Sequence, residues 1–376
     1  MIKMLYLDNS ATTRVHVEVF KAMIPYLQEE YGNPSSKYYT LAENAKKAVE
    51  EAREKVANLV GCEPEEVIFT SGATESNNMI IKGVAHYYRK NGSHIITSKV
   101  EHPSVIETCK YLEQLDYKVT YLKVDQYGRV NLDELETEIK KDPPILVSII
   151  WGNNELGSLN DIMSISEICK RYNVFFHSDA TQIIGKVKFK LSDFPGIRFL
   201  TFSGHKFHGP KGIGVAIIKK DENGVKTKIT PLLHGGGQEF DYRSGTLAVH
   251  NIVGIGKAAE IAARDLDQNI KKLEELERKC KEVLCSKFGD QIIFNNDNKE
   301  KIPGILNFIL KGVNNQRFII KHSNLVALST GSACSSTKPS HVLQAIGKTE
   351  NEIRSTLRIT LSTDINPEDL EIIYQL

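Results

Sequence analysis

Short apolar runs alternate with stretches of helical periodicity along most of the chain, and this alternation constrains the fold more than any other feature. The runs are rich in β-branched and aromatic residues, as buried strands are. Between several of them lie stretches with the apolar spacing of surface helices, such as 41–60 and 162–172. Strands that alternate with helices are typical of a mostly parallel sheet with helices on both faces, so we predict an α/β fold. The predicted strands are residues 66–70, 94–97, 118–122, 145–150, 174–176, 199–202 and 214–218.

The chain is expected to form two domains, because 376 residues is long for a single core. Near residue 253 the alternation gives way to a long helical pattern rich in Lys and Glu, residues 261–288, followed by shorter mixed elements. We place the domain boundary near the start of this pattern. The prediction is a large domain, residues 15–255, and a smaller α+β domain formed by residues 1–14 and 256–376.

Composition argues against several classes of function. Lys and Arg number 48 against 47 Asp and Glu, a formal net charge of +1, so we expect no direct binding to nucleic acid or to membrane. No apolar run approaches the roughly 18 residues of a membrane span, and the first residues lack a signal-peptide pattern, so we expect a cytoplasmic location. The six cysteines show no C-x-x-C spacing, so we predict reduced thiols, most of them buried, and no metal site.

Polar residues follow the predicted strands, at the edge where sheets of this kind bind ligands. The turn 70–77 opens a helix and offers backbone N–H groups to a phosphate, although an ordinary N-cap is the simpler interpretation of the turn by itself. His102 precedes Pro103, which suits a first helical position, so its imidazole either caps the helix or faces a flat ring. The amides of residues 151–157 either bind a carboxylate or form a turn.

Two charged residues follow buried strands. An unpaired Asp179 carboxylate would be costly there, so it meets a cation, which is either a nearby Lys or Arg or a protonated ring nitrogen. Lys206 lies in the glycine-rich stretch 203–214, where desolvation favours the neutral amine that Schiff-base chemistry needs. Lys211 competes for this role, and a plain anion-binding loop is the alternative. A phosphate cup, a stacking histidine, a carboxylate for a ring nitrogen and a Schiff-base lysine together specify pyridoxal 5'-phosphate as the cofactor.

These residues resemble the cysteine desulfurases of the NifS/IscS kind, within the class V branch of the aminotransferase-like enzymes. The likeness extends from residue 5 to Arg358, which is nearly the whole chain. It implies a pyridoxal-phosphate-dependent transferase of fold type I that converts L-cysteine to L-alanine and keeps the sulfur as an enzyme persulfide. The matching segments are residues 5–13, 31–36, 70–76, 203–206, 235–239, 243–246 and 331–335.

The resemblance implies a role for each matching residue around the cofactor. Lys206 would bond the cofactor covalently and move protons at the substrate Cα. Asp179 would hold the ring nitrogen, Gln182 the ring hydroxyl, and His102 would stack on the ring and assist protonation. The phosphate would be held by Gly72, Ala73, Thr74, Ser203, His205 and, from the second subunit of a homodimer, Thr246.

Substrate binding and sulfur transfer would fall to other matching residues. Asn154 and Arg358 would bind the substrate carboxylate, the arginine as a bidentate fork. Cys334 lies among small residues, typical of an exposed loop that can bring a thiolate to the substrate and then to an acceptor protein. A cysteine in such a loop is usually incidental, and the cofactor together with the loop sequence makes it the sulfur carrier here.

The sequence leaves alternatives open. Another pyridoxal-phosphate reaction, such as selenocysteine cleavage or transamination, uses much of the same machinery. A non-catalytic scaffold of the same fold is the alternative from a different functional class. The sequence also does not choose between iron-sulfur cluster assembly, tRNA thiolation and DNA phosphorothioation as the destination of the sulfur.

Overall fold

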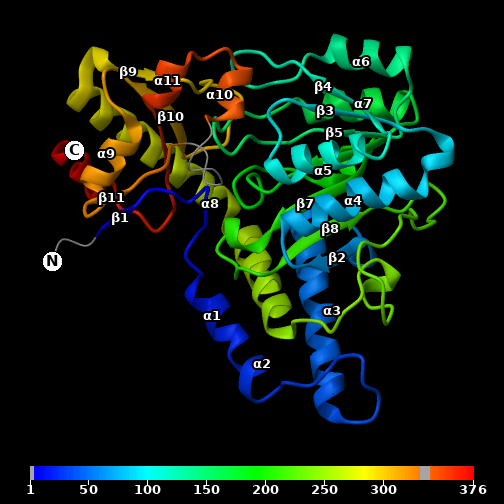
Figure 1. Ribbon diagram of the computed structural model, residues 1–376. Helices are drawn as coiled ribbons and strands as arrows, with labels where there is room; N and C mark the ends of the chain where they lie inside the picture. Colours follow the sequence, from blue (N-terminus) through cyan, green and yellow to red (C-terminus); the bar gives the residue numbers. More distant parts are fainter. Residues whose placement is uncertain (1–3, 331–338) are drawn as a thin grey trace.

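The computed structural model describes residues 4–330 and 339–376, and its largest element is a seven-stranded sheet (Figure 1). In chain order its strands are β2 (Val67–Thr70), β3 (His94–Ser98), β4 (Lys118–Leu122), β5 (Leu146–Ser148), β6 (Phe175–Asp179), β7 (Ile197–Ser203) and β8 (Gly214–Ile218). Across the sheet the order is β2-β8-β7-β6-β5-β3-β4, and every neighbouring pair from β7 to β4 is parallel. The predicted mostly parallel sheet is confirmed.

Strand β8 runs antiparallel to both of its neighbours, β7 and β2. Residues 204–213 alone connect β7 to β8. This connection is shorter than the crossover of about a dozen residues or more that parallel neighbours require, so the chain returns antiparallel. This short connection holds Lys206 next to the carboxyl end of β7.

Helices cover both faces of the sheet, as predicted. In β2, Val67 and Phe69 join one core and Ile68 joins another, because successive side chains of a strand point to opposite faces. The first core lies under α3 (Thr40–Val60), α6 (Leu132–Lys141), α7 (Ile162–Arg171) and the first part of α8 (Val249–Phe288). The second core lies under α4 (Ala73–Tyr87) and α5 (Pro103–Glu113).

A smaller group of elements packs around a separate core that includes Leu7 and Leu273. It contains an antiparallel sheet of order β12-β10-β9 and the parallel pair β1-β11. Its strands are β1 (Leu5–Tyr6), β9 (Ile292–Phe294), β10 (Ile305–Leu310), β11 (Val326–Ala327) and β12 (Thr356–Thr360). The other α-helices of the described residues are α1 (Val17–Met23) and α2 (Pro25–Gln28), which contact α8, and α9 (Asn315–His322), α10 (His341–Ala345) and α11 (Glu350–Arg354). The longest 3-10 helix of the described residues is Pro367–Gln375.

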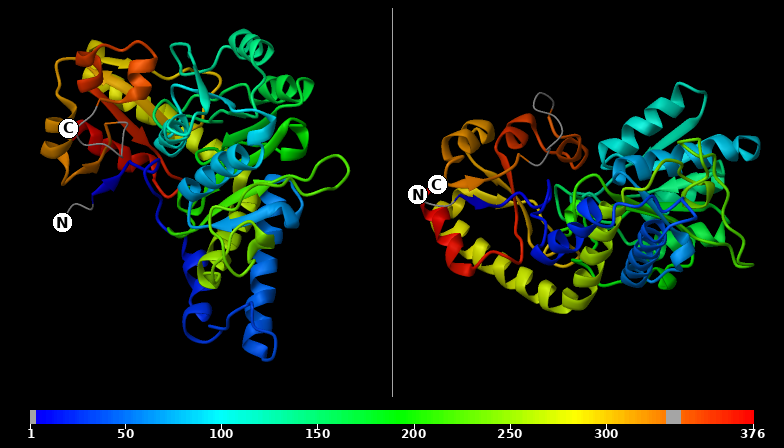
Figure 2. Two further views of the ribbon diagram at one scale, coloured as in Figure 1. Left: turned by 45° about the vertical axis from the view of Figure 1, so that its right-hand side comes forward. Right: turned by 90° about the horizontal axis from the view of Figure 1, so that it is seen from below.

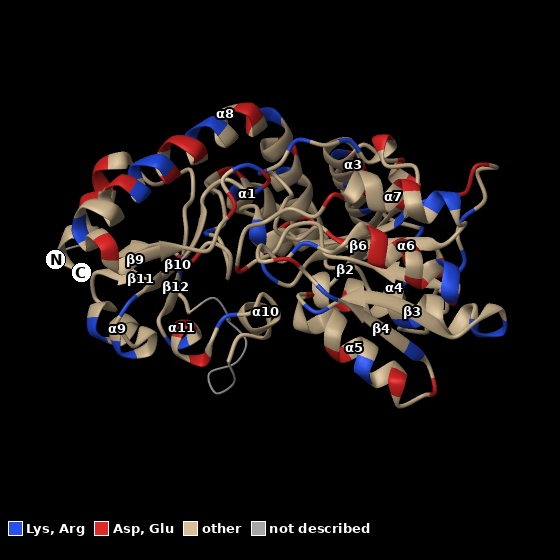
Figure 3. Cartoon of the chain, turned by 90° about the horizontal axis from the view of Figure 1, so that it is seen from above, with Lys and Arg blue, Asp and Glu red and all other residues tan. Residues whose placement is uncertain are grey.

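Helix α8 links the two groups of elements, and Figure 2 shows it running along one side of both. Residues up to Ala262 pack in the core under the large sheet, whereas residues from Leu273 onward pack in the smaller core. Acidic and basic residues alternate along its exposed side (Figure 3). The helix begins at Val249, well before the predicted start at residue 261. The prediction missed these first turns because they are largely apolar and lack the charges that marked the pattern.

We propose that residues 15–255 form the large domain, and that residues 1–14 and 256–376 form the small one. The separate cores and the pairing of β1 with β11 support this division. Among the described residues, no helix combines the length and the apolar character that crossing a membrane requires.

Candidate active site

A cavity of about 470 Å³ lies at the carboxyl ends of the central strands. Thr246 is exposed and does not line it, and Cys334 lies outside the described residues. Glu101 and Lys186, to which we assigned no role from the sequence, are buried. The cavity lining contains these predicted residues: Gly72, Ala73, Thr74, His102, Asn154, Asp179, Gln182, Ser203, His205, Lys206 and Arg358.

The predicted phosphate cup is the N-terminus of α4. Gly72 is the N-cap residue, and the first backbone N–H groups of a helix have no partner within the helix, which favours an anion. The start of β8 packs closely on this turn, since a Cβ on Gly214 would lie 2.5 Å from the Cα of Gly72. Ser203 and His205, at the end of β7, line the same cavity. This geometry brings the turn and the glycine-rich stretch together.

Lys206 lies between the sheet and the N-terminal segment 8–13. Its Nζ donates hydrogen bonds to the backbone oxygens of Ser10 (2.6 Å) and Ala11 (2.7 Å). The amide nitrogen of Gln182 donates to the same Ser10 oxygen over 3.1 Å. Ser10 and Ala11 therefore line one wall of the site, although we assigned no role to this segment from the sequence.

Asp179 is held by hydrogen bonds at the end of β6. The amide of Asn77 donates to its Oδ2 over 2.8 Å, and the backbone N–H of Thr181 donates to its Oδ1 over 3.0 Å. Among the described residues the carboxylate forms no ion pair with a Lys or Arg. The described residues therefore do not form the salt bridge to a Lys or Arg that was one of the two interpretations of this carboxylate.

His102 caps a helix and also lines the cavity. Its Nδ1 accepts a hydrogen bond from the backbone N–H of Ser104 over 3.1 Å, so it caps α5, and the ring also lines the cavity. Because burial lowers its pKa, the neutral imidazole is favoured, and an accepting Nδ1 leaves the ring proton on Nε2. Burial likewise lowers the pKa of His205 to about 4, helped by the charges of Lys206 and Lys211.

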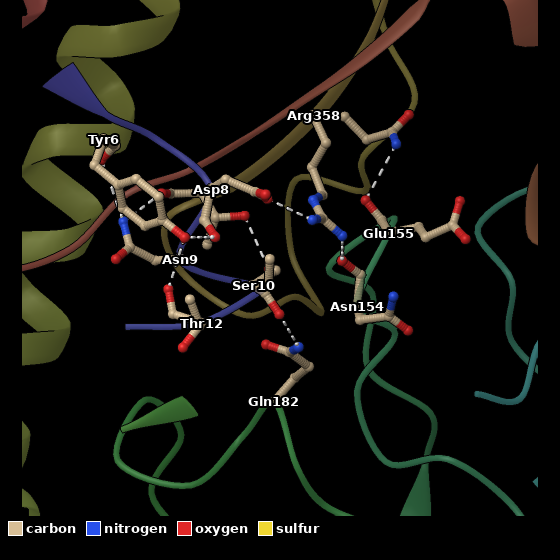
Figure 4. A network of polar contacts seen from close by, with 12 residues as sticks. Tyr6, Asp8, Asn9, Ser10, Thr12, Asn154, Glu155, Gln182 and Arg358 are labelled. Atoms are coloured by element: carbon tan, nitrogen blue, oxygen red, sulfur yellow. Dashed lines mark hydrogen bonds and ion pairs between the residues drawn. The ribbon is translucent and has the colours of Figure 1, made fainter. Parts of the chain in front are cut away.

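The predicted carboxylate site lies at the other side of the cavity, where Arg358 is nearly fully buried on β12 (Figure 4). Its Nη1 donates to the backbone oxygen of Asn154 over 2.8 Å, and its Nη2 lies 2.6 Å from Asp8 Oδ1. The neighbouring Glu155 is buried, burial raises its pKa, and Ser340 donates to it over 2.6 Å.

The described cysteines differ in environment. Cys109, Cys169 and Cys280 are buried, as expected for most cysteines of the chain, whereas Cys62 is half-buried and Cys285 is exposed. Burial strongly raises the pKa of the thiols of Cys62, Cys109 and Cys169, which disfavours the reactive thiolate. No cysteine of the described part of the chain lines the cavity. In that part there is also no group of His, Cys, Asp and Glu arranged to hold a metal ion.

The residues of the cavity fit pyridoxal 5'-phosphate. A lysine amine, a helix N-terminus and a hydrogen-bonded carboxylate are the groups that bind its aldehyde, phosphate and ring nitrogen. Two buried oxygens beside the cavity, Thr181 Oγ1 and Gln182 Oε1, have no hydrogen-bond partner among the described residues, as expected where a polar ligand belongs.

Known proteins match this chain along nearly its whole length. The model of the family described as aminotransferase class-V matches residues 5–373. A protein named Cysteine desulfurase IscS from Dictyoglomus turgidum is 43% identical over 374 residues, which cover 98% of this chain and 92% of the relative. A solved structure of a NifS-like protein matches with a TM-score of 0.91 at 37% identity, covering 99% of this chain and 98% of that one.

A second solved structure, described as SspA in complex with cysteine, matches with a TM-score of 0.83 at 34% identity. The match covers 96% of this chain and 99% of that one. The fold, the lysine at the end of β7 and these matches agree, and the chain belongs to the class-V aminotransferase family.

Proposed function

We propose that this chain is a pyridoxal-phosphate-dependent cysteine desulfurase. It converts L-cysteine to L-alanine, holds the sulfur as a persulfide on Cys334 and passes it to an acceptor protein. The observation that carries this proposal is the gathering of Lys206, Asp179, His102 and Arg358 around one cavity, in a chain whose relatives are named cysteine desulfurases. A related structure described as a complex with cysteine supports this substrate over the alternatives.

The cofactor would be held by the lining residues described above, with its phosphate at the N-terminus of α4 and its ring nitrogen at Asp179. When bound, it supplies an electron sink that weakens the bonds at the substrate Cα and Cβ. Lys206 would bond the cofactor in the resting enzyme and, once released, move the proton at Cα. His102, with its proton on Nε2, would assist that transfer.

Substrate orientation falls to the far side of the cavity. Arg358 and Asn154 would bind the carboxylate, which fixes the direction of the cysteine side chain. The thiolate of Cys334 attacks the substrate sulfur, a sulfur–sulfur bond forms, and the Cβ–S bond breaks with its electron pair left on carbon. Protonation of that carbon yields alanine, so cysteine and one enzyme thiol give alanine and one enzyme persulfide without an external oxidant.

The assembly that we propose is a homodimer in which Thr246 reaches the phosphate of the second subunit. Its exposure away from the cavity of its own chain supports this arrangement. The cytoplasmic location expected from the sequence stays a prediction, as does the pathway that receives the sulfur.

The test is to give L-cysteine to the parent protein and to a Cys334→Ala variant, and to measure alanine and protein-bound sulfur that cyanide releases. The parent should form both, and the variant should form alanine roughly a hundredfold or more slowly, because it lacks the nucleophile. Exposed Cys285 provides the matched control, and its replacement by alanine should change neither product. Alanine formation at the parent rate by Cys334→Ala would refute the proposed sulfur transfer.

A further inference from the structure

Asp8 and Arg358 form an ion pair at the wall of the active site. The Arg358 Nη2 lies 2.6 Å from Asp8 Oδ1, and the side chains of the arginine and the aspartate are 1% and 19% exposed. The pair thus places a fixed carboxylate on the guanidinium that we propose as the binding group for the substrate carboxylate. Figure 4 shows Asp8 and Asn154 contacting this guanidinium from different elements.

The backbone fixes Asp8 relative to the strand that carries Arg358. Asp8 forms a bridge to Thr360 of β12, and the Thr360 N–H donates to the oxygen of Leu7 over 2.7 Å. The Asn9 amide donates to the oxygen of Thr360 over 2.9 Å. Since these contacts hold both members of the ion pair on one rigid unit, the carboxylate is already positioned before any ligand arrives.

The phenol of Tyr6 adds to this rigidity. Its hydroxyl donates to the backbone oxygens of Asp8 and Thr12, each over 3.1 Å. Burial, followed by the charge of Asp8, raises the pKa of Tyr6, which keeps the hydroxyl protonated as a donor. The Tyr6 side chain therefore closes residues 6–12, which include Asp8, into a loop.

A fixed carboxylate on Arg358 affects different ligands unequally. A simple anion from solution has to share the guanidinium with Asp8, and it meets a pair whose charges already balance. An amino acid that the cofactor also holds through its amino group presents its carboxylate at a high effective concentration, so it tolerates the same competition. The other buried acid beside Arg358, Glu155, has a pKa raised by burial and compensates the guanidinium less.

We propose that Asp8 is a specificity-determining residue that balances the charge of Arg358, so that simple anions are excluded while amino acids held by the cofactor are accepted. This inference rests on the proposed function for the identity of the substrate. It assigns to Asp8 a role in selecting ligands, which the sequence did not indicate.

Acetate is the probe for this proposal, and its dissociation constant is measured on the holoenzyme from the broadening of the carbon-13 resonance of labelled acetate. Asp8→Asn keeps the shape and a hydrogen-bond acceptor but removes the charge. It should bind acetate roughly tenfold more tightly, which corresponds to about 1.4 kcal/mol. The gain should vanish in the double variant Asp8→Asn, Arg358→Gln, and Asp8→Glu should stay within about threefold of the parent. Equal or weaker binding of acetate by Asp8→Asn would overturn the proposal.

The matched control is Asp297→Asn, which removes a carboxylate paired with Arg129 away from the cavity and should leave acetate binding unchanged. Circular dichroism checks that each variant is folded, and Asp8→Ser replaces Asp8→Asn if the latter does not fold. Chloride should inhibit alanine formation more strongly in the Asp8 variant. A parent protein that forms no alanine from cysteine would refute the proposed function, whereas the acetate measurement would still decide the role of Asp8.

Discussion

Asn77 donates a hydrogen bond to Asp179, with its amide nitrogen 2.8 Å from Oδ2. The same nitrogen lies 2.8 Å from Ser104 Oγ, which in turn lies 2.8 Å from His102 Nδ1. One buried amide on α4 thus connects the carboxylate proposed for the ring nitrogen with the histidine proposed to stack on the ring. These contacts join three helix and strand ends that the sequence placed separately.

Replacing Asn77 by alanine should weaken cofactor binding, because the Asp179 carboxylate loses a donor that fixes its orientation. The expected change is a roughly tenfold higher dissociation constant for pyridoxal 5'-phosphate, the size of one lost hydrogen bond to a charged group. Equilibrium dialysis with the cofactor measures it. Asn44→Ala, which alters an exposed amide that contacts Glu30, is the control and should bind as the parent does. Unchanged affinity in Asn77→Ala would show that Asp179 does not depend on this contact.

The covalent anchor of the cofactor is predicted to be Lys206 rather than Lys211, although both line the cavity. Borohydride reduction should fix the coenzyme to the parent protein and to Lys211→Ala, and mass spectrometry should find it on the peptide that contains Lys206. Lys206→Ala should retain less than about 1% of this adduct, since the amine that forms the bond is gone. A fixed adduct in Lys206→Ala at the parent level would show that another amine is the anchor.

Sharing of the site between subunits predicts complementation between two inactive variants. Lys206→Ala lacks the anchor, and Thr246→Asp should repel the phosphate of the other subunit. A mixed dimer then contains one site with an intact Lys206 and an intact Thr246, so mixing after mild denaturation should restore activity in alanine formation. Each variant refolded alone should stay inactive. If the mixture also stays inactive although mixed dimers form, Thr246 acts within its own chain, and if Thr246→Asp alone is active, Thr246 does not bind the phosphate.

The buried carboxyl of Glu101 predicts a pH-dependent loss of stability. Burial raises its pKa from 4.5 to about 8, although Ser98 and the Ile150 N–H hydrogen-bond to it. The unfolded chain therefore loses the proton near pH 4.5 and the folded chain near pH 8. Its contribution to stability is fully present below the lower value and is lost as the pH rises through the higher one.

Glu101→Gln removes this titration while keeping the shape of the side chain. The free energy of unfolding of the parent minus that of the variant should fall between pH 5 and pH 8, by up to about 1.4 kcal/mol for each pH unit. Denaturant unfolding at a series of pH values measures it. Glu107→Gln, which makes the same change at an exposed side chain, serves as the comparison. A difference for Glu101→Gln that is flat with pH would contradict the raised pKa.

Much of the fold followed from local pattern, and the exceptions have physical causes. Helix α3 and the seven strands of the large sheet were predicted close to their observed bounds, because apolar periodicity reports which face of an element is buried. The strands of the smaller group were not predicted individually. The predicted start of α8 was wrong, because the first turns of this helix pack in the core and lack the charged face that marks a surface helix. The antiparallel direction of β8 depends on a short connection that was not taken into account.

The candidate site was predicted only in part. Motif residues such as Lys206 and Asp179 follow strands directly, so their place at one edge of the sheet could be inferred from the fold class alone. Asn77 and Asp8 gave no comparable signal, because their importance comes from contacts with residues far away in the chain. Asp8 lies in the matching segment 5–13 and Asn77 in the turn 70–77, but neither residue was assigned a partner.

The sequence by itself determined the alternation of strands and helices, and it placed the chemically versatile side chains at the ends of strands, because both are properties of neighbouring residues. Only the tertiary structure decided which of them meet. The approach of β12 to residues 8–13 pairs Arg358 with Asp8, and the packing of α4 against β6 pairs Asn77 with Asp179. Such pairs depend on how distant elements pack in three dimensions, and no local pattern records that packing.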